Sequence, residues 1–141
     1  MNYLNLSDDF LKAAEQYCTY DPDIPFPFRV LAKLLAESRF SDALRIMDAN
    51  PDAFTGTYSW MPLDSAVEMC LNQVQEKDGV YYPVQDAVHF IAYLLEHGAN
   101  PKLPAHFHQL EHLADLEEDS TQQTGFRFDC SEIRELLEQY W

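Results

Sequence analysis

The sequence is poor in basic residues and in glycine. Nine lysines and arginines stand against 24 aspartates and glutamates in 141 residues, so the formal net charge is -15. A field of this sign repels phosphate backbones and disfavours direct binding to nucleic acid. The four glycines form no phosphate-binding loop, and no Gly-x-Ser-x-Gly motif occurs. These absences count against nucleotide-dependent and serine-hydrolase chemistry, and we do not expect an enzyme.

Long hydrophobic runs are also missing. No apolar stretch approaches the roughly 18 residues that a membrane span requires, and the first residues show neither the basic region nor the apolar core of a secretory signal. The three cysteines, Cys18, Cys70 and Cys130, are odd in number and widely spaced. Each lies in or beside an apolar helical pattern, which is typical of buried, reduced thiols. We therefore expect a cytoplasmic protein without membrane contact.

The acidic residues are unevenly distributed. Residues 1–60 carry a net charge of -4, whereas residues 61–141, with fifteen acidic and four basic residues, carry -11. No lysine or arginine occurs between Lys102 and Arg127, and an acidic cluster lies there: Glu111, Asp115, Glu117, Glu118 and Asp119. Such a region steers a basic protein surface toward the chain. The alternative is that the acidity only keeps the protein soluble.

Residues 86–101 contain the clearest structural pattern. Apolar side chains recur there at helical spacing and define one buried face: Ala87, Val88, Phe90, Ile91, Leu94 and Leu95. Asp86 suits the first turn of a helix, Gly98 suits the left-handed residue after the last turn, and Pro101 prevents the helix from resuming. The spacing predicts a helix whose final leucines lie in the core.

Other segments show the same periodicity between turn signals, and we expect about seven helices in one domain. The first helix is expected to begin after a cap at Ser7, and two more helices follow before Pro51. The other four are expected to begin near Pro62, near Asp86, near Gln109 (over about 109–116), and after Asp129 or Ser131. The insertion 73–83 is expected only to turn the chain, at Lys77-Asp78-Gly79. The predicted fold class is therefore all-α, with no sheet beyond short turns.

Two of these segments resemble the ankyrin repeat. Residues 61–66, Met-Pro-Leu-Asp-Ser-Ala, follow the family's Thr-Pro-Leu-His-x-Ala start, and residues 94–100, Leu-Leu-Glu-His-Gly-Ala-Asn, follow its ending. The resemblance implies stacked antiparallel helix pairs, an ankyrin-like α-solenoid. It places degenerate repeats at 28–116, an N-terminal capping helix and its loop at 1–27, and a C-terminal capping helix at 117–141. A general array of helix hairpins is the alternative.

In ankyrin arrays the loops between repeats project as fingers and, with the first helices, line a concave binding face. The resemblance places these fingers at 53–60 and 102–107, and both carry aromatic side chains. Aromatic anchors ringed by charge are typical of protein-binding hot spots. The expected partner-binding residues are Phe54, Tyr58, Trp60, Asp64, Glu68, Phe107, Glu111 and Asp115. Each aromatic ring can instead fill a gap between repeats, and the tyrosines of 79–83 are either a second contact or a lid on the core.

Residues 108–112, His-Gln-Leu-Glu-His, match the His-x-x-Glu-His pattern of one class of zinc peptidases. Two histidines four residues apart share a helix face and can hold zinc, while Glu111 would activate water. That class needs a third ligand on a distant downstream helix, and too little of the chain follows His112 to supply it. We therefore expect no metal and no cofactor. A hydrolase that uses His108, Glu111 and His112 is the weakest alternative.

The sequence leads to three functional hypotheses. The first is an acidic interaction module that binds and neutralises a basic protein, because degenerate ankyrin-like proteins of this size resemble the immunity proteins of bacterial toxin pairs. The second is a phage-type inhibitor that mimics the charge of DNA; it requires carboxylates spaced like phosphates, whereas here they cluster at 111–119. The third is the zinc hydrolase. The partner's identity, the oligomeric state and the choice between inhibitor and general adaptor are open at this point.

Overall fold

The computed structural model describes residues 2–102 and 109–141. Most of the described chain is helical, as the sequence predicts, and none of its helices combines the length and the apolar character that crossing a bilayer requires. The elements in chain order are α1 (Asp8–Glu15), α2 (Phe26–Ala36), α3 (Phe40–Ala49), α4 (Met61–Met69), β1 (Val74–Lys77), β2 (Val80–Pro83), α5 (Gln85–Glu96), α6 (Gln109–Thr124), β3 (Arg127–Phe128) and α7 (Ser131–Gln139).

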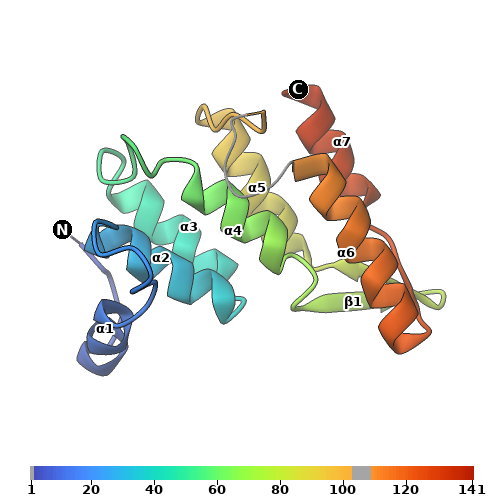
Figure 1. The fold of residues 1–141 in the computed structure, drawn as a ribbon, viewed down its shortest axis with the longest axis horizontal. Helices are drawn as coiled ribbons and strands as arrows, with labels where there is room; N and C mark the ends of the chain where they lie inside the picture. Colours follow the sequence, from blue (N-terminus) through green and yellow to red (C-terminus); the bar gives the residue numbers. More distant parts are fainter. Residues whose placement is uncertain (1, 103–108) are drawn as a thin grey trace.

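The helices after α1 form neighbouring pairs: α2 with α3, α4 with α5, and α6 with α7. The first members, α2, α4 and α6, contact one another in turn as one row, and α3, α5 and α7 do the same as a second row (Figure 1). α1 packs on α2 at the N-terminal end of the stack. Two rows of amphipathic helices bury their apolar sides against each other, so the core runs between the rows.

The apolar face predicted near the end of the second pair is buried. All six of its residues lie in the core: Ala87, Val88, Phe90, Ile91, Leu94 and Leu95. The two final leucines are 4% and 2% exposed, so the prediction that they are core residues is confirmed. Across the second row, the ring of Phe90 lies 6.2 Å from that of Phe40 in α3. Aromatic packing therefore joins consecutive helix pairs.

Local hydrogen bonds end these helices largely as the sequence predicts. The side chain of Ser7 accepts a hydrogen bond from the backbone of Phe10 at 3.1 Å, which confirms the predicted cap of α1. Gly98 has φ +96°, and Ala99 N donates back to Leu94 O at 3.0 Å, which confirms the predicted exit from α5. Ser38 adopts the same left-handed backbone conformation after α2, with φ +59°, although the sequence has no glycine at that point.

The prediction that the fold contains no sheet is wrong. β1 and β2 form an antiparallel hairpin, and β2 also pairs in parallel with β3, so Tyr81 lies opposite Phe128. Asp78 and Gly79, with φ +54° and +81°, make the two-residue turn of the hairpin. An Asp-Gly pair between β-prone residues is a strong hairpin signal, because both turn residues must be left-handed. From the sequence, this pair was interpreted only as a turn of the chain, and β3 was not predicted.

The helix expected over about 109–116 is longer than predicted, since α6 continues to Thr124. The additional turns are polar and have no apolar period for sequence reasoning to detect. They are supported by side-chain contacts instead: Glu117 pairs with Arg134 of α7, and Gln122 donates to Glu118 within the helix. The helix ends where Gly125 adopts φ +76°.

The three cysteines are free thiols. Cys70 and Cys130 are buried, as expected, while Cys18 is half-buried. A side-chain hydrogen bond with Cys70, together with burial, raises the pKa of Cys130 above its ordinary value. Because the thiolate is the reactive form, the raised pKa holds the Cys130 thiol in an unreactive state.

Candidate protein-binding surface

The first predicted finger loop folds back onto the protein. Phe54 is only 6% exposed and packs edge-to-face on Phe28 of α2, with ring centroids 5.4 Å apart. Tyr58 is half-buried, and its hydroxyl donates to Asp21 Oδ2 at 2.8 Å. This hydrogen bond raises the pKa of Tyr58. The structure thus places both rings against α2 and the loop before it, where they stabilise the fold, and we leave them out of the candidate surface.

Trp60 lies on the other side of this loop, toward α6. It is half-buried at the start of α4 and lines a small hollow of about 50 Å³ together with the turn 98–100 and Gln109, the first residue of α6. Phe107, predicted as an anchor on the second finger, lies outside the described residues. His108 of the zinc-peptidase pattern also lies outside them. Trp60 is therefore the predicted aromatic anchor that the structure brings near the acidic helix.

Asp64, predicted to supply surface charge, is 3% exposed. Its Oδ1 accepts a hydrogen bond from Gln109 Nε2 at 3.1 Å. The bond joins α4 to α6 inside the first row of helices, and a buried carboxylate needs such a partner because its desolvation is costly. Asp64 is a structural residue in this fold, whereas Glu68, one turn later on the same helix, is exposed.

Asp64→Ala is expected to lower the free energy of unfolding by about 1–3 kcal/mol, because the truncation leaves the buried amide of Gln109 without its acceptor. Glu68→Ala removes a carboxylate from the exposed position on α4 and is expected to change the free energy by less than about 0.5 kcal/mol. Urea denaturation of the two variants measures the difference. Equal losses near zero would contradict the interior role of Asp64.

The predicted acidic cluster forms a continuous row on α6. Four carboxylates are exposed on the side of the helix away from the buried Leu113: Glu111, Asp115, Glu118 and Asp119. They span about 12 Å along the helix axis at 1.5 Å per residue. Glu117 turns toward α7 instead and pairs with Arg134. The row therefore presents concentrated negative charge at the C-terminal end of the stack, where α6 is drawn in orange (Figure 1).

A hollow of about 430 Å³ borders this acidic row. Glu118 and Thr121 line it from α6, and Phe128 and Arg134 line it from β3 and α7. Beside it lies an aromatic cluster built around Tyr81 of β2. The ring of Phe128 stacks on that tyrosine at 5.5 Å, and the ring of Phe126 meets it edge-on at 5.2 Å.

Phe126 is the exposed member of this cluster. It is 54% exposed, which is unusual for a large apolar side chain, and it directly follows the left-handed Gly125. The pairing of β3 with β2 then fixes its direction. Phe126 and Phe128 are not among the binding residues predicted from the sequence. The available signal was the alternation Phe-Arg-Phe after the exit glycine, which is typical of a short strand with both rings on one face.

We define the α6–β3 surface as the four exposed carboxylates of α6, the exposed Phe126 that precedes β3 and the half-buried Phe128 on β3: Glu111, Asp115, Glu118, Asp119, Phe126 and Phe128. Its carboxylates attract lysine and arginine side chains, and its aromatic faces bind the same cations through their quadrupoles. Both features are complementary to basic side chains. Aromatic rings near carboxylates, as the sequence predicts for a binding surface, thus occur here, but both rings lie on or beside β3 rather than on the finger loops.

A metal centre has little support from the described residues. Within 2–102 and 109–141, no group of three histidine, cysteine or carboxylate side chains is arranged to hold an ion. His112 is half-buried on α6, and Glu111 is exposed beside it. Because His108 is outside the described ranges, the zinc hypothesis stays a prediction that the structure does not test.

Comparison of the chain with protein-family models, with curated protein sequences and with solved structures finds no match. The function has to be inferred from the chemistry of the chain's own surface.

Proposed function

We propose that this chain is an acidic protein-interaction module that binds and neutralises a basic protein partner, as an immunity protein does for its cognate bacterial toxin. The observation that carries the proposal is the row of exposed carboxylates on α6, together with the exposed Phe126 that follows the end of this helix. Aromatic anchors supply desolvated contact area, while surrounding charges set orientation and exclude wrong partners. The proposed action is occupation of the partner's surface, without catalysis.

The proposal extends to an ankyrin-like origin of the scaffold. The three stacked helix pairs, Pro62 in the first turn of α4 and the left-handed Gly98 after α5 support it. The hairpin between α4 and α5 departs from a pure helical array. Stacked pairs of this kind present an extended rigid face, so little conformational entropy is lost when a partner binds. The free buried thiols are compatible with the reducing cytoplasm that we propose as its location.

Affinity capture from an extract of the cells that produce the protein tests the proposal. The full chain is expected to retain one basic protein, released as salt rises, because screening weakens attraction between exposed charges. Asp115→Lys with Asp119→Lys, which reverses charge on the row, is expected to lose it. Asp8→Lys with Asp9→Lys makes the same charge change on the exposed start of α1 and is expected to retain it.

Mass spectrometry identifies the retained protein and so decides between the functional hypotheses. Equal retention by both double variants, or retention of an acidic protein, would contradict the proposal. A retained nucleic-acid-binding protein that free DNA displaces would instead support the hypothesis of a DNA mimic, since the chain and the phosphate backbone would then compete for the same basic surface.

A further inference from the structure

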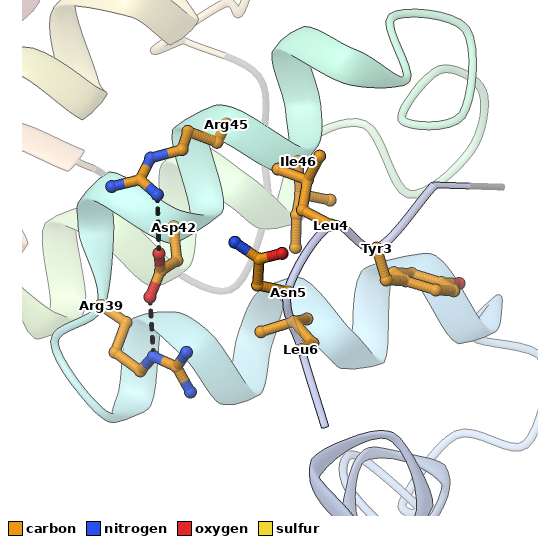
Figure 2. A pocket seen from close by; sticks show the side chains of 8 residues that line it. All are labelled: Tyr3, Leu4, Asn5, Leu6, Arg39, Asp42, Arg45 and Ile46. Carbon is orange, nitrogen blue, oxygen red and sulfur yellow. Dashed lines mark hydrogen bonds and ion pairs between the residues drawn. The ribbon is translucent and has the colours of Figure 1, made fainter. Parts of the chain in front are cut away.

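A second pocket lies at the other end of the molecule, between the N-terminal segment 3–6 and α3. Its volume is about 220 Å³. Figure 2 shows Leu4 and Leu6 reaching it from the segment, while Ile46 reaches it from α3. These three side chains give one wall of the pocket an apolar character. This site is separate from the α6–β3 surface and shares none of its residues.

The opposite wall is charged and net cationic. Arg39 donates from Nε to Asp42 Oδ2 at 2.9 Å, and Arg45 Nη1 lies 3.7 Å from Asp42 Oδ1 (Figure 2). Two guanidinium groups thus share one carboxylate, in a chain whose formal net charge is -15. A local positive excess in so acidic a protein marks this wall as complementary to an anion.

Arg39 is held in place with part of its binding capacity unused. Its guanidinium carbon lies 5.1 Å from the centroid of the Phe10 ring, which fixes the plane of the group by a cation–π contact. Its Nε is occupied by Asp42, whereas its two terminal nitrogens donate no hydrogen bond to any residue in 2–102 or 109–141. An oriented guanidinium with two open donors is suited to a planar, two-oxygen anion.

The N-terminal segment is pinned across the pocket in a constrained conformation. Asn2 N donates to Asn50 Oδ1 at 3.0 Å, and Asn50 Nδ2 donates back to Asn2 O at 2.6 Å. Leu4 then adopts φ +52°, a left-handed conformation that is uncommon outside glycine, and its side chain is 44% exposed. Strained residues of this kind concentrate at binding sites. The two asparagines hold an apolar side chain at the pocket without burying it.

We propose that this pocket binds a carboxylate carried on a short apolar group. The terminal nitrogens of Arg39 would form the paired hydrogen bonds that a guanidinium makes with a carboxylate, and Leu4 and Ile46 would cover the apolar part. The pocket is small, with a volume of about 220 Å³, which suits an acid of amino-acid size. Two sources share this chemistry: the C-terminal residue of a peptide and a free monocarboxylic acid.

Nuclear magnetic resonance titration of the ¹⁵N-labelled full chain tests the proposal with acetyl-glycyl-leucine, its C-terminal amide and 4-methylpentanoate. The two carboxylates are expected to shift the backbone amides of Leu4 and Asn5 and the Nε–H of Arg39. The C-terminal amide is expected to shift none of these signals, because it lacks the negative charge that pairs with a guanidinium group. Tighter binding of the peptide assigns the site to a chain terminus, and equal or tighter binding of the free acid assigns it to a small molecule. Equal shifts with the amide, or no shifts with any compound, would overturn the proposal.

Three variants locate the binding. Arg39→Ala is expected to weaken carboxylate binding by about 10-fold or more, the effect of losing a charged hydrogen-bond pair. Arg45→Gln alters a side chain that is 61% exposed, so we expect little effect on folding, and it is expected to weaken binding by about 2–5-fold. Lys12→Ala removes one positive charge elsewhere in the N-terminal half and is expected to bind like the unmodified protein. Unchanged binding by both arginine variants would show that the carboxylate binds elsewhere.

Discussion

Replacing Phe90 with alanine is expected to lower the free energy of unfolding by about 3–5 kcal/mol. The ring is fully buried in α5 and packs at 6.2 Å on the ring of Phe40. α5 stands in the middle of the second row and contacts α3, α4 and α7, so neighbours on three sides restrain it. Those neighbours cannot collapse into the cavity, and the lost burial is compounded by the cost of the empty space.

His89→Ala is the matched control, since it truncates the preceding, exposed residue of the same helix. Its free energy of unfolding is expected to change by less than about 0.5 kcal/mol. Urea denaturation followed by circular dichroism measures both variants, and an unchanged dependence on urea concentration shows that the denatured states are comparable. A near-neutral Phe90→Ala would place the apolar face of α5 away from the core and would overturn the stacking of the helix pairs.

The second large effect concerns the kinetics of partner binding, and it rests on the proposed function. Glu111→Lys with Asp115→Lys is expected to slow association by about 10–100-fold at low salt, because a concentrated row of charge steers the encounter. The difference is expected to shrink as salt shortens the screening length to about 10 Å at 0.1 M. Surface plasmon resonance with the captured partner measures these rates. A rate that depends neither on the variant nor on salt would remove the acidic row from the interface.

Phe126→Ala is expected to act on the lifetime of the same complex. An aromatic anchor contributes about 2 kcal/mol or more, which corresponds to roughly 30-fold faster dissociation with little change in association. Tyr20→Ala is the control, because that ring is 69% exposed in the N-terminal half and lies outside the α6–β3 surface. If the two variants dissociate at the same rate as the unmodified protein, the anchors lie elsewhere, and Trp60 is the next candidate.

The helices were predictable wherever an apolar face repeats. The six buried residues of α5, the cap at Ser7 and the exit at Gly98 follow from local sequence, because periodic burial and end-capping depend on neighbours within a few residues. The polar second half of α6 was not predictable in that way. Its turns are supported by the contact of Glu117 with Arg134 in a different helix, and such a contact leaves no periodic signal.

The acidic half of the candidate surface was predictable and the aromatic half was not. Carboxylates clustered at 111–119 remain near the surface in almost any fold, because burying them unpaired is costly. Asp64 shows the exception, since Gln109 satisfies it inside the protein. An aromatic ring on a loop can be buried without a comparable desolvation cost, so its type alone does not predict whether it is exposed. Phe54 packs inward onto Phe28, whereas Phe126 is exposed. The Phe-Arg-Phe alternation indicates a short strand, but it does not indicate that the first ring stays exposed.

The sequence by itself determined the helical class, the apolar faces and the segregation of negative charge into the second half of the chain, because composition and short-range periodicity set these properties. Only the tertiary structure decided which side chains share a surface. The pairing of β3 with β2 brings Phe126 and Phe128 to Tyr81, and the asparagine bonds across the N-terminal segment bring Leu4 to Arg39. Such contacts join residues far apart in the chain, and their geometry depends on how whole elements pack rather than on any local preference.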